Sequence, residues 1–172
     1  MSTNTIASAM KVDVPSISAS VHFCKMFSDN YGYCIVDGAS GKAAVVDPGE
    51  PEHVYNMCQA LGITPSMVLC THHHNDHSGG NAFFKEMMPA IEVPANPNPP
   101  LNNPHLNPNL NPNPHLNPHF NPNLYPNRQV VGTKYETIPS VTQPVGSGDR
   151  VLLGELVIDT LYTPCHTKGH VV

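Results

Sequence analysis

The chain has 172 residues, of which 40% are hydrophobic and only 12% are charged, and this length allows one globular domain. Its formal net charge is −5 and it contains no basic run, so binding to nucleic acid or to an anionic membrane surface is not expected. No apolar run is long enough to span a bilayer, and residues 1–20 form a polar N-terminal extension that lacks the pattern of a secretory signal. This extension contains one lysine and no arginine, which gives a mitochondrial signal no support, so we expect a cytoplasmic protein.

The domain is expected to begin at Val21 with three short strands. We predict these strands at Val21–Phe27, Tyr31–Asp37 and Lys42–Val46. Turn-forming residues at positions 28–30 and 38–41 separate them. Because short connections join antiparallel neighbours, the three strands should form an antiparallel meander.

A helix is predicted next, over Pro51–Leu61. Proline suits the first helical turn, and Gly62 suits the position after the helix end. The apolar residues recur with helical spacing and should form one buried stripe, made of Val54, Met57, Cys58 and Leu61.

The order of the remaining elements predicts an α/β fold. Met67–Cys70 is a short, fully apolar segment, typical of a strand that is buried on both faces. A second helix is expected at Gly80–Met88, so strands and helices alternate along the chain. Downstream we expect a strand and a hairpin, at Gln129–Thr133, Arg150–Leu153 and Glu155–Tyr162.

An insertion at residues 95–128 interrupts the predicted domain, which spans residues 21–172. The insertion repeats the motif Leu-Asn-Pro-(Asn/His), and proline at this density blocks both helix and sheet. We therefore predict a disordered Asn/Pro-rich segment. A folded repeat array is the competing interpretation, but a four-residue period is far shorter than the units that stack in such arrays. The histidines of the repeat are interpreted as part of it and not as metal ligands; they are His105, His115 and His119.

The strongest chemical signal is the segment Thr-His-His-His-Asn-Asp-His at residues 71–77, between an apolar strand and a helix. Side chains two positions apart share a face of extended backbone, so His72 and His74 can converge on one metal ion. Asp76 and His77 lie where the chain turns into the helix and can reach a neighbouring ion. Imidazole and carboxylate ligands together suit Zn²⁺, with Fe or Mn²⁺ as alternatives.

Two residues near this cluster are interpreted as outer partners of the ligands. His73 should point away from His72 and His74, which favours a hydrogen-bonding or packing role. Asp47 follows the third strand, and two interpretations stay open for it. It either stabilises the turn at Pro48 or accepts a hydrogen bond from a metal-bound histidine.

The five cysteines occur singly: Cys24, Cys34, Cys58, Cys70 and Cys165. An odd number without Cys-x-x-Cys spacing does not indicate a disulfide framework, so we expect buried, reduced thiols. Cys165 lies beside His166 and is interpreted as a packed thiol, because one side of a strand cannot present both residues.

Four segments of this chain resemble the metallo-β-lactamase superfamily. They are Asp29-Asn30-Tyr31, Val45-Val46-Asp47-Pro48, Thr71–Asn81 and Thr163–Val171. The pattern His-x-His-x-Asp-His is specific for the superfamily. The segment Thr-Pro-Cys-His-Thr-x-Gly-His narrows the resemblance to the glyoxalase II, or hydroxyacylglutathione hydrolase, family.

The resemblance implies an αββα sandwich, of which this chain holds the N-terminal half and the start of the second half. It also implies two metal ions, the first held by His72, His74 and His166, the second by Asp76 and His77. Asp76 would orient a bridging hydroxide, and His170 would be an outer partner. The substrate would be a thioester of glutathione, such as S-lactoylglutathione, in methylglyoxal detoxification, or a thioester of trypanothione.

The chain also departs from the family pattern. The family supplies a bridging aspartate and a further histidine beyond position 170, so we expect a C-terminally shortened and impaired member with an exposed apolar sheet face. Asn75 stands where many members have an aromatic residue. Two alternatives are a non-catalytic metal-binding remnant of the fold and an enzyme similar to persulfide dioxygenases.

Overall fold

The computed structural model describes residues 9–88 and 129–172. The Asn/Pro-rich insertion predicted at residues 95–128, with its three histidines, lies outside the described residues. Among the described residues, no helix is both long enough and apolar enough to cross a membrane.

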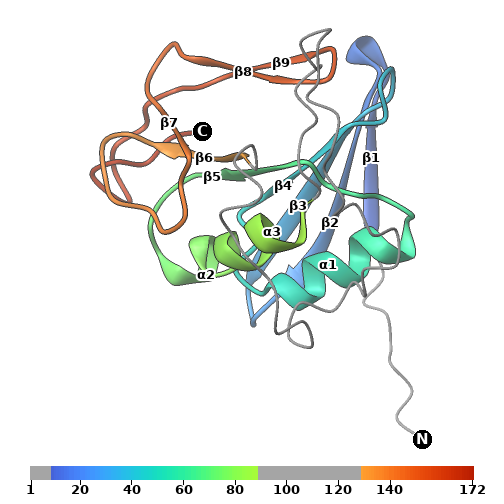
Figure 1. The fold of residues 1–172 in the computed structure, drawn as a ribbon, viewed down its shortest axis with the longest axis horizontal. Coiled ribbons are helices and arrows are strands. Elements are labelled where there is room, and N and C mark those ends of the chain that lie inside the picture. The colour runs from blue at the N-terminus through green and yellow to red at the C-terminus, as the bar shows by residue number, and fades with distance from the viewer. Residues whose placement is uncertain (1–8, 89–128) are drawn as a thin grey trace, which may run out of the picture.

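The main element is a seven-stranded sheet with the strands in sequence order (Figure 1). Neighbouring strands from β1 to β4 are antiparallel, and those from β4 to β7 are parallel. The strands are β1 (Met10–Val14), β2 (Ala19–Met26), β3 (Asn30–Asp37), β4 (Ala43–Val46), β5 (Met67–Cys70), β6 (Gln129–Thr133) and β7 (Gln143–Val145). The predicted meander and the predicted strands at Met67–Cys70 and Gln129–Thr133 are therefore confirmed.

Helices cover one face of this sheet (Figure 1). They are α1 (Pro51–Ala60), the one-turn α2 (Asn75–Ser78) and α3 (Asn81–Met87), and a short 3₁₀ turn at Pro15–Ile17 joins β1 to β2. The core between α1, α3 and the sheet includes Val54, Phe84 and Val130, each fully buried. Burial of such side chains contributes about 1.5–3 kcal/mol each. The predicted helix at residues 51–61 is confirmed, but Leu61 lies at its C-terminal end and is 40% exposed, so it does not extend the buried stripe.

A hairpin of β8 (Arg150–Leu153) and β9 (Leu156–Asp159) covers part of the opposite face. Val151 and Leu153 pack with the sheet residues Ala44 and Val131 in a second core. The layers are therefore helices, sheet and hairpin, as expected for the first half of an αββα sandwich and the start of its second sheet. The outward face of the hairpin exposes apolar side chains, among them Leu152 at 67%, as the prediction of an exposed apolar face requires.

Asp37, at the end of β3, anchors this hairpin to the main sheet. Its carboxylate accepts hydrogen bonds from the backbone N–H groups of Ala39 at 3.1 Å and Glu155 at 2.8 Å, and from the Ser40 hydroxyl. Glu155 lies 118 positions further along the chain, in the turn between β8 and β9. The side chain is 1% exposed, so these hydrogen bonds satisfy a buried charge.

The sheet begins earlier than the sequence analysis predicted. Strand β1 pairs with β2 through Met10↔Phe23 to Val14↔Ala19, inside the segment that we expected to precede the domain. Four of its five residues are exposed, because β1 is an edge strand. The sheet therefore starts at Met10 and not at Val21. The apolar residues of β1 alternate with Lys11 and Asp13, but the strand lies at the sheet edge and stays mostly exposed, so it does not have the buried face of the later strands.

Candidate metal centre

The histidine-rich segment lies where the parallel strands of the sheet end. Residues 71–77 follow β5 directly, and Asp47 follows the neighbouring β4. The carboxyl ends of adjacent parallel strands meet at one edge, which is where open α/β sheets bind their ligands. The C-terminal segment returns to this edge, since the Val171 N–H donates to the Thr71 carbonyl at 3.1 Å.

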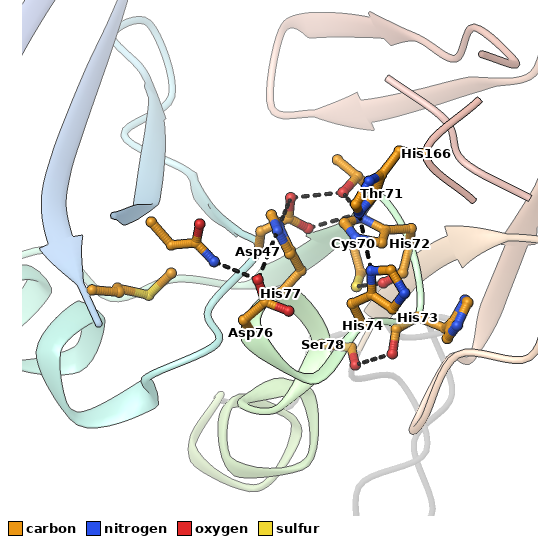
Figure 2. A network of polar contacts seen from close by, with 12 residues as sticks. Asp47, Cys70, Thr71, His72, His73, His74, Asp76, His77, Ser78 and His166 are labelled. Atoms are coloured by element: carbon orange, nitrogen blue, oxygen red, sulfur yellow. Dashed lines mark hydrogen bonds and ion pairs between the residues drawn. The ribbon is translucent and has the colours of Figure 1, made fainter. Parts of the chain in front are cut away.

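Three histidines converge at this edge: His72, His74 and His166 (Figure 2). Each offers one ring nitrogen, and these three nitrogens all lie within 4.8 Å of one another. Nδ1 of His74 and Nε2 of His166 are only 3.0 Å apart. The ring centroids of His72 and His166 are separated by 4.8 Å. The structure thus brings together the three side chains that the resemblance implied for the first metal ion.

His72 presents an unpaired ring nitrogen to this cluster. Its Nε2 is buried and has no hydrogen-bond partner among the described residues. Burial lowers the pKa of His72 to about 4 from its ordinary 6.5, so the ring is neutral at physiological pH. One of its two nitrogens therefore carries a hydrogen and the other a lone pair.

Thr71 determines which nitrogen of His72 carries the hydrogen. The Thr71 hydroxyl donates its single hydrogen to Asp47 Oδ2 at 2.7 Å, since a carboxylate can only accept. The same hydroxyl oxygen is 2.9 Å from Nδ1 of His72, so it accepts from that nitrogen. The lone pair of His72 consequently lies on Nε2, the buried atom without a partner. A neutral imidazole that offers a lone pair in this way is the form that binds metals.

Asp76 and His77 belong to α2, which lies beside the three converging histidines. Asp76 Oδ2 is 3.4 Å from His77 Nε2, and the Asn30 side-chain amide donates to the same oxygen at 2.6 Å. The rings of His72 and His77 have centroids 4.2 Å apart. Of the five ligands expected from the sequence, three form one cluster, and the remaining two form an adjacent pair.

The carboxylate of Asp47 faces the histidine-rich segment and not the turn at Pro48. The residue sits in a turn with a φ of +47°, and its carboxylate accepts from the Thr71 N–H at 2.8 Å. It also lies 3.1 Å from Nδ1 of His77. The hydrogen bond to Asp47 raises the pKa of His77 above its ordinary value. Asp47 therefore contacts His77 directly and is linked to His72 through the Thr71 hydroxyl.

His73 and His170 lie at the margin of the cluster. The His73 ring lies outside the group of converging nitrogens: its Nδ1 is 3.0 Å from Glu136 Oε1, and its ring centroid is 4.7 Å from that of His74. Nδ1 of His170 is 2.8 Å from the Thr163 hydroxyl, and its ring centroid lies 5.2 Å from that of His72. Neither residue belongs to the group of three converging nitrogens.

Three side chains at the site were not assigned a role from the sequence: Asn30, Thr71 and Glu136. Asn30 and Thr71 fall within the segments that carry the family resemblance, and Thr71 directly precedes His72, but the sequence does not indicate the hydrogen bonds that these two residues make. Glu136 lies in the loop between β6 and β7 and follows no motif. Only the folded chain brings it to the cluster.

The interpretation of Cys165 as a packed thiol is wrong. Its thiol is exposed, whereas Cys24, Cys34, Cys58 and Cys70 are buried and reduced, as predicted. Strand β9 ends at Asp159, so residues 163–168 form a surface loop and not the end of a strand. The argument from strand faces therefore does not apply at this position.

Comparison with known protein families shows the superfamily to which the chain belongs. The family model described as the metallo-beta-lactamase superfamily matches residues 29–172. The chain belongs to this superfamily. The match includes both segments that supply the converging histidines, and superfamily membership implies a bound metal.

Curated relatives within the superfamily are named as hydrolases. The chain is 33% identical to the cytoplasmic hydroxyacylglutathione hydrolase of Arabidopsis thaliana over 144 residues, which cover 83% of this chain and 42% of the relative. It is 32% identical to the hydroxyacylglutathione hydrolase of Thermosynechococcus vestitus, covering 84% of this chain and 43% of the relative. The chain thus spans less than half the length of these relatives.

Solved structures share the superfamily fold. A crystal structure of ETHE1 from Myxococcus xanthus matches with a TM-score of 0.55 at 20% identity, covering 95% of this chain and 52% of the other. A metallo-beta-lactamase structure from Staphylococcus aureus matches with a TM-score of 0.52 at 19% identity, covering 88% of this chain and 36% of the other. Likeness at this level of identity establishes the fold alone.

Proposed function

We propose that this chain carries the metal centre of a thioester hydrolase similar to the hydroxyacylglutathione hydrolases. The observation that carries the proposal is the convergence of His72, His74 and His166, with a buried lone pair on His72 Nε2. A buried acceptor without a partner is unfavourable by about 1–3 kcal/mol, and a cation at the cluster would satisfy it. The three imidazoles suit Zn²⁺, with Fe or Mn²⁺ as alternatives.

The residues would divide between two ions. His72, His74 and His166 would hold the first ion, and Asp76 with His77 would hold the second. Bound metal supplies a water of lowered pKa and polarises the carbonyl of the substrate. The chain contributes the orientation of the ligands, because Asn30 holds Asp76 and Asp47 holds both Thr71 and His77.

The proposed substrate is an S-(2-hydroxyacyl)glutathione such as S-lactoylglutathione. Hydrolysis would break the bond between the acyl carbon and sulfur, add a water oxygen to that carbon, and release a hydroxy acid and a protonated thiol. The relatives named hydroxyacylglutathione hydrolase support this substrate class. Methylglyoxal detoxification would be the setting in a cytoplasmic protein, and a trypanothione thioester is the alternative substrate.

Metal binding and hydrolysis should be measured on the same preparation. We expect the metal-free chain to bind zinc in competition with a chelator, and His74→Ala to abolish that binding. Hydrolysis of S-lactoylglutathione should then be compared between this chain and a version extended by the downstream reading frame. Zinc binding with hydrolysis in neither version would favour the non-catalytic remnant. A failure of both versions to bind zinc would contradict the proposal.

The persulfide dioxygenase alternative predicts a different metal and reaction. One iron per chain, with oxygen consumption in the presence of glutathione persulfide, would favour it. The likeness to ETHE1 gives it no support beyond the shared fold, because the two sequences are only 20% identical. Two zinc ions per extended chain and thioester hydrolysis would favour the hydrolase.

A further inference from the structure

Glu136 is a carboxylate that lies between the two segments carrying the converging histidines. It sits in the loop between β6 and β7, and its side chain is 12% exposed. Oε1 accepts from the His73 N–H at 2.9 Å and from the Thr167 hydroxyl at 3.2 Å. Oε2 accepts from the Gly169 N–H at 2.9 Å. One side chain therefore bonds to both segments.

The donors to Glu136 are immediate neighbours of the converging histidines. His73 stands between His72 and His74, so a hydrogen bond to its backbone N–H restrains both of those residues. Thr167 follows His166 directly, and Gly169 precedes His170. The carboxylate thus contacts a residue next to each of the three converging histidines. It bonds to the backbone N–H of His73, between His72 and His74, and to the side-chain hydroxyl of Thr167, beside His166.

The contact is close and largely excluded from water. Thr167 is only 7% exposed, and Gly169 is buried. A Cβ atom at position 169 would lie 2.5 Å from Cγ of Glu136, so glycine is what allows the backbone to approach this side chain. Hydrogen bonds to an ionised acceptor are about twice as strong as those between neutral groups, and low exposure preserves that strength.

We propose that Glu136 is a positioning residue that joins the two segments and preforms the metal centre before a metal binds. The inference rests on the proposed metal centre and adds to it the group that aligns its ligands. Glu136 makes no contact with the metal site itself in this role. It acts through the backbone of His73 and Gly169, through the Thr167 hydroxyl, and through the His73 imidazole, whose Nδ1 is 3.0 Å from Oε1.

Glu136→Gln is the decisive variant, with Glu52→Gln as its matched control. Glutamine keeps the shape of the side chain, but one oxygen becomes an NH₂ group that would face a donor of the protein. Glu52 is exposed in the first turn of α1 and lies outside the site, so its neutralisation controls for the change in net charge.

The first measurement is zinc affinity by chelator competition on the 172-residue chain. Mutating a residue that orients metal ligands typically weakens metal binding by about 10- to 100-fold. We expect a loss in this range for Glu136→Gln and none for Glu52→Gln. If Glu136→Gln lowered only the thermal midpoint and bound zinc as tightly as the wild type, Glu136 would be a structural residue and the inference would be overturned.

The second measurement is hydrogen exchange at the His73 and Gly169 amides in the metal-free chain. Both should exchange faster in Glu136→Gln, while amides of the central strand β5 keep their rates. Unchanged rates at both positions would overturn the inference. If the wild type bound no zinc, the proposed function would fail, and the exchange rates alone would decide whether Glu136 joins the two segments.

A double-mutant cycle with Thr167→Val tests the bond across the two segments. Thr167→Val removes one donor and leaves the Gly169 and His73 amides in place. We expect the losses in zinc affinity to be less than additive, because both variants break the same hydrogen bond. Fully additive losses would show that the two residues act separately, which the inference excludes.

Discussion

Nδ1 of His74 and Nε2 of His166 lie 3.0 Å apart, although 92 positions separate the two residues in the chain. A hydrogen bond between two imidazoles requires that one nitrogen carry a hydrogen and the other a lone pair. A cation bound to both nitrogens would require two lone pairs, so metal binding would displace that hydrogen. The contact shows that the fold brings together two possible metal ligands from distant segments of the chain.

His166→Ala tests whether this long-range contact belongs to the metal centre. It removes one of only three converging nitrogens, so zinc affinity should fall by more than the roughly 10- to 100-fold expected for an outer partner. His53→Ala is the control, because His53 lies on α1, is 52% exposed and pairs with Glu50. Chelator competition measures both variants. Equal zinc affinities in the two would remove His166 from the site.

The hydroxyl of Thr71, and not the size of its side chain, should determine how Thr71 affects zinc affinity. Thr71→Val removes the acceptor that holds the hydrogen on Nδ1 of His72, so the lone pair is no longer restricted to Nε2. We expect zinc affinity to fall about 10- to 100-fold. Thr71→Ser keeps the hydroxyl and should retain most of the affinity. A serine variant as weak as the valine variant would indicate that the methyl group, and hence packing, is what matters.

Local patterns carry enough information to predict most of the fold. The meander, α1 and β5 follow from alternation, turn residues and an apolar stripe, because each buries side chains along its own length. The clustering of His72 and His74 follows from their spacing after a strand. The family resemblance, and not the spacing, supplied His166.

Other features of the fold and the site could not be predicted from local sequence patterns. Strand β1 has the alternating sequence Met-Lys-Val-Asp-Val, but four of its five residues are exposed, so burial does not mark it as part of the domain. Glu136 and Asn30 reach the site only because β6 and the β2–β3 turn lie beside it in the folded chain. Cys165 was misassigned because a strand was assumed where the chain forms a loop. For Asn30 and Glu136 the deciding contact joins residues far apart in sequence.

Thiol labelling should distinguish Cys165 from the other four cysteines. Burial raises the pKa of Cys24 to about 11 and that of Cys70 to about 12, so these two thiols are both inaccessible and protonated near neutral pH. We expect one thiol per native chain to react rapidly with an alkylating reagent, and Cys165→Ala to abolish this rapid phase. Rapid labelling of two or more thiols, with a native circular dichroism spectrum, would contradict the buried positions.

Asp37 should give the chain a pH-dependent stability on the acid side. The N–H of Glu155, followed by the Ser40 hydroxyl, lowers the pKa of Asp37 from 3.8 to about 2. Because the folded value is depressed, the stabilisation is complete above about pH 4 and is lost as the pH falls towards 2. The difference in urea midpoint between wild type and Asp37→Asn should therefore shrink on acidification through this range. Asp13→Asn, at an exposed ion pair, is the control, and a constant difference for Asp37→Asn would contradict the anchoring role.

Gly154, in the turn of the β8–β9 hairpin, should not tolerate a side chain, because it lies against Asp37 and Ser40. It has a φ of +63°, and an added Cβ would lie 2.0 Å from the Ser40 hydroxyl oxygen and 2.3 Å from Asp37 Oδ2. Gly41 has a similar φ of +72° but nothing within 4 Å of an added Cβ. Both alanine variants should lose about 1–2 kcal/mol of unfolding free energy to the left-handed backbone conformation. Gly154→Ala should lose about 1–3 kcal/mol more through overpacking. Equal losses in urea unfolding would mean that Ser40 and Asp37 can move aside, and that the hairpin does not depend on the close approach seen here.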